Sequence, residues 1–163
     1  MNYSDFLKEL DRRLKKYYSS HKEHVHCKKG CSLCCENGDY PMSQIEFEYL
    51  MKGYIELDNE TKATVQNNVK NMVKGGICPF LINKQCSVYS NRPIICRVHG
   101  IAYICMDNTV KVPYCANEGL NYSSVYSDGE IVINPVLENL DTQNLLKDYD
   151  CGEIKNLTDW LTQ

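Results

Sequence analysis

The chain has 163 residues, about the length of one domain, and a net charge of only -3 with 24% charged residues. This near balance of charge gives no electrostatic reason to expect binding to nucleic acid or to an anionic membrane surface. No apolar run approaches the roughly 20 residues that cross a bilayer, and the first twenty residues mix charged and apolar side chains rather than forming a secretory signal. We therefore expect a cytoplasmic protein that forms a single domain over residues 1–163.

The first predicted element is an amphipathic helix. Apolar side chains recur at helical spacing from Tyr3 to Tyr18, with charged residues between them. A polar linker that contains His21, His24 and His26 follows, and the cysteine-dense stretch 27–35 is expected to be a tight loop.

Two helices are predicted in the middle of the chain. Ser43 and Glu46 have the spacing of a capping box, so a helix should begin there and end near Gly53. Asp58 can cap a second helix that runs as far as Gly75-Gly76. The inward side of the first of these helices is expected to consist of Ile45, Tyr49, Met51 and Tyr54.

Short strands and turns are predicted after these helices. Between residues 77 and 98, apolar pieces separated by Asn83-Lys84 indicate a hairpin, and Asn91-Arg92-Pro93 indicates a turn. Asn134-Pro135 is expected to open another helix, and a last short helix should carry Leu157, Trp160 and Leu161. Further strand candidates are residues 102–106, 109–112 and 130–133. The predicted fold class is α+β, mainly helical, built around an irregular cysteine-rich metal centre with a short β-hairpin.

Ten cysteines require a physical reason in a reducing compartment, because glutathione and thioredoxin keep disulfides open there. Their share of the chain, about 6%, is below the level of roughly 8–10% that is typical of a disulfide scaffold. Thiolate ligation of a metal is therefore favoured, and disulfides are the minor alternative. Cys105 and Cys151 are expected to act only as small buried side chains.

The other eight cysteines fall into two groups. The first is Cys27-x3-Cys31-x2-Cys34-Cys35, whose spacing lets one loop direct several thiolates at one centre. The second group is dispersed and must be gathered by the fold: Cys78, Cys86, Cys96 and Cys115. Eight thiolates could hold two four-cysteine zinc sites, a shared two-metal centre, or an iron–sulfur cluster. Adjacent cysteines such as Cys34 and Cys35 seldom bind one ion well, which favours two nearby metals or a cluster.

These cysteine blocks resemble a known family. Together with Cys78-Pro79-Phe80-Leu81 and Cys86-x-Val88-Tyr89-x2-Arg92-Pro93-x2-Cys96-Arg97, they are similar to the CxxCxxCC or YkgJ-like cysteine-cluster family of zinc- or iron-chelating domains. The resemblance covers about residues 27–115, with helical flanks on both sides. By motif position it implies the ligands Cys27, Cys31, Cys34, Cys35, Cys78, Cys86, Cys96 and Cys115. The family often has Cys-Pro-Gly where this chain has Cys115-Ala116-Asn117, so Cys105 is the alternative eighth ligand.

The same blocks occur in flagellin lysine-N-methylases. This distant resemblance implies an iron–sulfur centre with S-adenosylmethionine as the methyl donor. The spacing Cys27-x3-Cys31-x2-Cys34 is also that of radical S-adenosylmethionine enzymes, although this chain is short for the partial barrel on which they are built.

Two arginines are predicted to bind the cofactor indirectly. Arg92 and Arg97 flank Cys96. They could donate hydrogen bonds to the sulfurs of a cluster or offset the charge of several thiolates. His99 is a weaker candidate ligand, because a lone histidine on a turn is more often solvated or hydrogen-bonded to backbone. The sequence contains no glycine-rich phosphate loop, and no cysteine–histidine pair stands out as a catalytic nucleophile.

Three functions are compatible with these residues. The first is an iron–sulfur protein, with a 4Fe-4S cluster favoured, that acts in methyl or other group transfer on a protein substrate. The second is a zinc-stabilised, non-catalytic module that presents a surface to a protein partner. The third is a metal storage or delivery protein. The opening cysteine triplet and the methylase resemblance favour the first, and the sequence assigns no catalytic residue.

Overall fold

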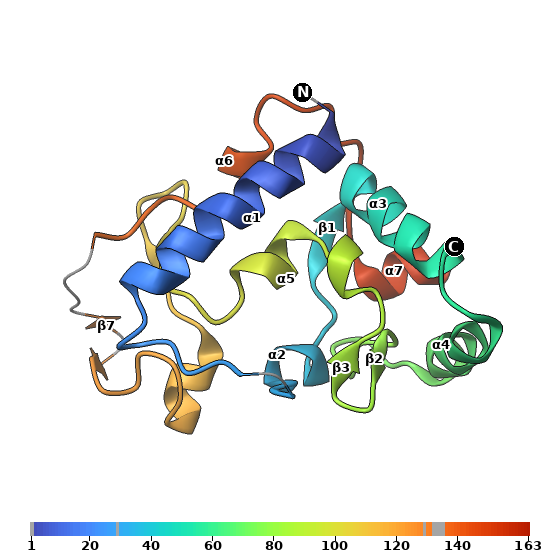
Figure 1. Ribbon diagram of the computed structural model, residues 1–163, viewed down its shortest axis with the longest axis horizontal. Helices are drawn as coiled ribbons and strands as arrows, with labels where there is room; N and C mark the ends of the chain where they lie inside the picture. The colour runs from blue at the N-terminus through green and yellow to red at the C-terminus, as the bar shows by residue number, and fades with distance from the viewer. Residues whose placement is uncertain (1, 29, 129, 132–135) are drawn as a thin grey trace. The chain divides into compact units, whose positions relative to one another are not determined.

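The structure is a computed structural model that describes residues 2–28, 30–128, 130–131 and 136–163 (Figure 1). The chain forms two compact units, each made of two segments. Unit 1 contains Met1–Cys27 and Arg97–Tyr149, and unit 2 contains Lys28–Cys96 and Asp150–Gln163. The fold is α+β and mainly helical, as predicted, and the strands of the described residues form two-stranded antiparallel pairs. No helix in these described ranges is long and apolar enough to span a membrane.

Unit 1 is organised by the predicted N-terminal helix. Helix α1 (Tyr3–Ser20) begins after Asn2, whose side chain accepts a hydrogen bond from the amide of Asp5 (2.9 Å). Its buried face consists of Tyr3, Leu7, Leu10, Leu14 and Tyr17, which confirms the amphipathic pattern. The Tyr17 hydroxyl donates to the carbonyl of Ala102 (2.7 Å) and ties the helix to the second segment of the unit.

The second segment of unit 1 contains short elements only. Strands β4 (Tyr103–Ile104) and β5 (Val110–Lys111) form a hairpin within the ranges predicted for strands. They are followed by the 3-10 helix η2 (Tyr114–Glu118), the paired strands β6 (Tyr126–Ser127) and β7 (Glu130–Ile131), and helix α6 (Thr142–Leu145). The rest of the predicted strand at 130–133 and the predicted helix start at Asn134-Pro135 lie outside the described residues.

Unit 2 contains the remaining elements and a compact apolar core. In chain order they are α2 (Leu33–Glu36), β1 (Pro41–Ser43), α3 (Gln44–Ile55), α4 (Asn59–Asn71), β2 (Leu81–Ile82), β3 (Gln85–Cys86), the 3-10 helix η1 (Tyr89–Asn91), the start of α5 (Ile94–Val98), β8 (Ile154–Asn156) and α7 (Leu157–Leu161). The core consists of Met42, Leu50, Val65, Phe80, Val88 and Leu157. Cys78 and Cys86 pack against it as partly buried side chains.

The caps of α3 and α4 are as predicted, and the inward side of α3 is partly so. Its fully buried residues are Glu46, Leu50 and Gly53, while the predicted Met51 and Tyr54 are partly buried and pack against the core. The expectation treated α3 as an apolar stripe, whereas a buried carboxylate and a glycine packed against Asn91 occupy much of this face.

Helix α4 also ends earlier than predicted. Met72 is already extended (φ -68°, ψ 148°), so the helix stops before the glycine pair. The amide of Gly76 then donates to the carbonyl of Val73 (2.9 Å), which closes a turn outside the helix.

Strands β1 and β8 pair across most of the chain length, and this pairing was not predicted. Pro41 lies opposite Asn156 and Ser43 opposite Ile154. The pairing brings the predicted C-terminal helix, α7, into unit 2, where the Trp160 ring stacks on Phe47 with 5.0 Å between ring centroids.

Candidate metal centre

The first cysteine group lies on a turn that leads into one turn of helix. The amide of Cys31 donates to the carbonyl of Lys28 (3.0 Å), and the amides of Cys35 and Glu36 donate to the carbonyl of Ser32 (2.8 and 3.0 Å). The stretch expected to be a loop therefore contains α2, which carries Cys34 and Cys35. Their side chains are hydrogen-bonded to each other, so the two adjacent sulfurs lie together.

Backbone hydrogen bonds place Cys78 directly against this helical turn. The amide of Cys78 donates to the carbonyl of Cys35 (2.8 Å), and the amide of Gly38 donates to the carbonyl of Gly76 (2.9 Å). A β-carbon at position 38 would lie 2.6 Å from the β-carbon of Cys78 and 2.9 Å from the carbonyl oxygen of Cys35. Only glycine permits so close an approach of the two segments.

The predicted hairpin presents Cys86. Asn83 and Lys84 both have positive φ (49° and 61°), as in the type I′ turn that suits a two-residue hairpin. Strands β2 and β3 pair so that Leu81 lies opposite Cys86. The amide of Leu81 in turn donates to the carbonyl of Cys78 (3.0 Å), so one continuous piece of backbone carries both cysteines.

Cys96 is positioned by a buried carboxylate. Glu46 is 1% exposed and accepts hydrogen bonds from the Ser43 amide (2.9 Å) and hydroxyl (2.7 Å) with one oxygen, and from the Ile94 amide (3.0 Å) with the other. The predicted capping residue of α3 therefore also caps the start of α5, the short helix that carries Cys96. No local pattern predicts this second contact, because Glu46 and Ile94 are far apart along the chain.

Electrostatics indicate that five cysteines share one environment. Burial raises the pKa of Cys78 to about 12, raises that of Cys86, and raises that of Cys96 well above the ordinary range. The charges of neighbouring thiolates add to the rise at Cys96. We call this group the five-thiol site: Cys34, Cys35, Cys78, Cys86 and Cys96.

The two thiols of the Cys34–Cys35 pair differ in pKa. The hydrogen bond from Cys35 lowers the pKa of Cys34 to about 7, and the same hydrogen bond, together with burial, raises the pKa of Cys35. Cys34 is thus the thiol of the site that most readily becomes a thiolate, the form that binds metal.

The donor set of the five-thiol site fits a thiolate-bound metal. Thiolate sulfur selects zinc, copper(I) and iron–sulfur clusters, and both zinc and cluster sites take four cysteines. In the described ranges, no three or more histidine, cysteine, aspartate or glutamate side chains have the arrangement of a formed metal site. All ten cysteines are described, and each is a thiol rather than half of a disulfide.

Cys27 and Cys115 belong to unit 1, whereas the other six predicted ligands belong to unit 2. Cys27 is exposed, and its sulfur accepts a hydrogen bond from the side-chain amide of Asn121 (2.9 Å). Asn121 is buried and also bonds the carbonyl of Gly100 (2.7 Å) and the amide of His26 (2.7 Å), so it fixes the backbone beside Cys27. Cys115 lies in η2 and is partly buried.

The two predicted cofactor-binding arginines have different surroundings. The Arg92 guanidinium lies 3.8 Å over the Tyr89 ring and donates to the Tyr89 carbonyl (2.8 Å), and its charge opposes the effect of burial on the pKa of Cys86 and Cys96. The Arg97 side chain is 1% exposed and donates to both carboxylate oxygens of Asp11 (2.6 Å each) within unit 1. The charge of Arg92 therefore acts on the five-thiol site.

The remaining candidates are His99, Cys105 and Cys151. Burial lowers the pKa of His99 to about 4, so the ring is neutral at ordinary pH. Cys105 lies beside the β4–β5 hairpin, where its amide donates to the carbonyl of Thr109 (2.8 Å). The carbonyl of Cys151 accepts from the amide of Ile45 (3.3 Å). Burial raises the pKa of both these thiols.

The chain is a small α+β scaffold that brings several partly buried thiols together, which is the arrangement of a thiolate metal-binding domain. The profile of the CxxCxxCC family, described as "Putative zinc- or iron-chelating domain", matches residues 26–118. The chain belongs to this family, as its cysteine blocks predicted. No curated protein and no solved structure matches the chain.

Proposed function

We propose that this chain is a cysteine-ligated metalloprotein that holds an iron–sulfur cluster, with 4Fe-4S favoured. The observation that supports the proposal is the five-thiol site, because thiols of α2, the β2–β3 hairpin, α5 and Cys78 influence one another's pKa beside a small apolar core. The hydrogen-bonded pair Cys34 and Cys35 supports a cluster over a single ion. Two adjacent cysteines bind two different metal atoms of a cluster more easily than they both bind one ion.

The proposed ligands are Cys27, Cys31, Cys34, Cys35, Cys78, Cys86, Cys96 and Cys115, held within one domain that spans the chain. When bound, a cluster would supply a redox or substrate-binding centre. The partly buried thiols would shield it from water, and Arg92 would offset part of its negative charge. Arg97 is proposed to act on the same centre from its neighbouring position in α5.

Methyl or other group transfer is the proposed use of this centre. The family resemblance implies S-adenosylmethionine as the donor and a protein side chain as the acceptor. A cytoplasmic location accords with this proposal, because the ten thiols would remain reduced there.

A zinc-stabilised binding module is the second candidate function. It is favoured by the family's description, which includes zinc, and by a donor set of sulfurs that zinc accepts equally well. In that case the metal would order unit 2 and organise a surface for a protein partner without chemistry.

Purification without oxygen, followed by visible spectroscopy and analysis for iron, sulfide and zinc, tests the proposal. We expect a brown protein with broad visible absorption and matching amounts of iron and acid-labile sulfide. A colourless protein with stoichiometric zinc would replace the iron–sulfur proposal with the zinc module. A chain without bound metal would contradict both.

A further inference from the structure

We infer that Asp39 is a positioning residue for the metal centre, through which the C-terminal helix α7 fixes the spacing between Cys35 and Cys78. This inference rests on the proposed function. Residues 150–163 lie outside the part of the chain that the family profile matches, so the inference gives this C-terminal segment a role in the site.

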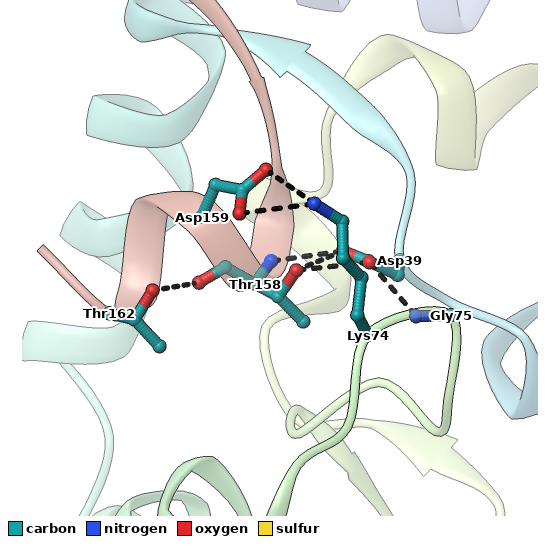
Figure 2. Close-up of polar contacts among 6 residues, drawn as sticks. All are labelled: Asp39, Lys74, Gly75, Thr158, Asp159 and Thr162. Atoms are coloured by element: carbon teal, nitrogen blue, oxygen red, sulfur yellow. Dashed lines mark hydrogen bonds and ion pairs between the residues drawn. The ribbon is translucent and has the colours of Figure 1, made fainter.

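The Asp39 carboxylate joins α7 to the turn before Cys78 (Figure 2). One oxygen accepts from the Thr158 amide (3.0 Å) and hydroxyl (2.9 Å), and the other accepts from the Gly75 amide (3.0 Å) and again from the Thr158 hydroxyl (3.0 Å). Hydrogen bonds to an ionised carboxylate are roughly twice as strong as neutral ones. Asp39 therefore holds α7 with both of its oxygens and the Gly75 turn with one.

These bonds continue directly into the cysteine-bearing backbone. Asp39 follows Gly38, whose amide donates to the carbonyl of Gly76, the residue after Gly75. Two residues further on, the Cys78 amide donates to the Cys35 carbonyl. Asp39 thus forms one end of a short ladder of hydrogen bonds. The bond between Cys78 and Cys35 forms the other end and determines how closely these two cysteines lie.

A neighbouring ion pair does not perform the same task. Lys74 and Asp159 also connect this turn to α7 (Figure 2), but their charged atoms are 3.4 Å apart and both side chains are largely exposed. Exposed pairs of this kind contribute little because water and salt screen them. Asp39 lies inward of this pair, partly buried, and makes the shorter bonds.

Asp58 provides a matched control. It caps α4 and accepts hydrogen bonds from the amide (2.8 Å) and hydroxyl (2.7 Å) of Thr61, the same two kinds of donor that Thr158 offers to Asp39. Helix α4 lies in the same unit but contains no cysteine. Asp39→Ala and Asp58→Ala therefore each remove an aspartate cap, and only Asp39 bonds directly to the turn that leads into Cys78.

The first measurement is the rate at which anaerobically purified protein releases its metal to excess EDTA, together with the visible spectrum of the centre. We expect Asp39→Ala to release metal about tenfold faster than the unchanged chain, the size of effect seen when residues that support metal ligands are removed. Asp58→Ala should release metal at the same rate as the unchanged chain, even if its melting temperature falls as much as that of Asp39→Ala. Asp39→Asn, which keeps one acceptor oxygen, should be intermediate.

The second measurement is amide hydrogen exchange at Cys78 and Gly38 in the metal-free chain. Both amides should exchange faster in Asp39→Ala and be unchanged in Asp58→Ala. Thr158→Val, which removes only the hydroxyl bonds to Asp39, serves if Asp39→Ala does not fold, and it should have a smaller effect in the same direction.

Equal metal release from the Asp39 and Asp58 variants, or unchanged exchange at Cys78 in both Asp39→Ala and Thr158→Val, would overturn the inference. An unchanged chain that carries no metal would contradict the proposed function instead. The exchange measurement on the metal-free chain would then still decide whether Asp39 positions Cys78.

Discussion

Individual cysteines differ in which groups surround their sulfurs. The pKa of Cys96 responds chiefly to burial and then to Cys78, Cys86 and Cys34, whereas that of Cys105 responds to burial and to the neighbouring Thr109 and Asp141. A thiol among thiols has the surroundings of a metal ligand, and a thiol among hydroxyl and carboxylate groups does not. We therefore expect Cys96, and not Cys105, to bind metal.

Replacing Cys96 should therefore affect metal content far more than replacing Cys105. We expect Cys96→Ala to lose most of its bound metal, because a cluster or zinc site needs its full set of four sulfurs. Cys105→Ala should keep the metal content of the unchanged chain. Elemental analysis of the two purified variants measures this, and similar metal contents in both would remove Cys96 from the ligand set.

The glycine that lies between the two cysteine segments should be equally sensitive. Gly38→Ala would place a β-carbon 2.6 Å from the β-carbon of Cys78 and 2.9 Å from the backbone of Cys35, so these segments must separate. We expect metal binding at least about tenfold weaker, as for other changes in the support of metal ligands. Asn37→Ala, at the exposed neighbouring position, is the control. Competition with a chelator measures the affinity, and equal affinities for the two variants would show that this close approach is not required.

Among the elements, α3 and α5 are joined by Glu46. Glu46→Ala would leave the buried amides of Ser43 and Ile94 without their acceptor. We expect the free energy of unfolding to fall by roughly 3 kcal/mol, since each unsatisfied buried donor costs about 1–3 kcal/mol. Urea denaturation followed by circular dichroism measures the change. The control is Glu48→Ala on the exposed side of the same helix, which should change stability by less than about 0.5 kcal/mol.

The end of α1 should respond to acid. Burial, and then the nearby His24, lower the pKa of His21 in the folded chain. The unfolded chain therefore takes up a proton first as pH falls through about 6.5, so the free energy of unfolding should decrease below that pH. Urea denaturation of the metal-free chain at pH 7 and pH 5 measures the loss. It should be smaller in His21→Gln and unchanged in His26→Gln, which alters an exposed histidine; equal losses in all three chains would contradict the assignment.

Local signals predicted elements well, whereas contacts between distant segments could not be predicted. The Ser43–Glu46 and Asp58 caps located the starts of α3 and α4, and Asn83-Lys84 located the hairpin turn, because each of these signals acts within a few residues. The β1–β8 pairing and the role of Asp39 depend on partners more than a hundred residues away, and short strands without apolar alternation give no periodic signal. The cysteine spacing predicted candidate ligands, and the fold added Asp39, Glu46 and Asn121, whose hydrogen bonds to the backbone near these cysteines no local pattern indicates.

For the molecule as a whole, metal and folding should be linked. The five-thiol site draws on three separate elements of unit 2, and its apolar core is small, so a bound metal would supply part of the stability of this unit. We expect removal of the metal by a chelator to lower the melting temperature. It should also raise amide exchange in the Cys31–Cys35 segment and in the β2–β3 hairpin to the same extent. Unchanged stability and exchange after complete removal would show that the site does not hold the unit together.

X-ray absorption at the metal edge would decide whether these cysteines bind metal, because it reports which atoms surround the metal. On protein purified without oxygen, we expect a first coordination sphere of sulfur at about 2.3 Å, the length of a metal–thiolate bond. An iron edge with a further iron–iron distance would identify a cluster, and a zinc edge with four sulfurs would identify the zinc module. A first sphere dominated by oxygen or nitrogen would contradict the assignment of these cysteines as ligands.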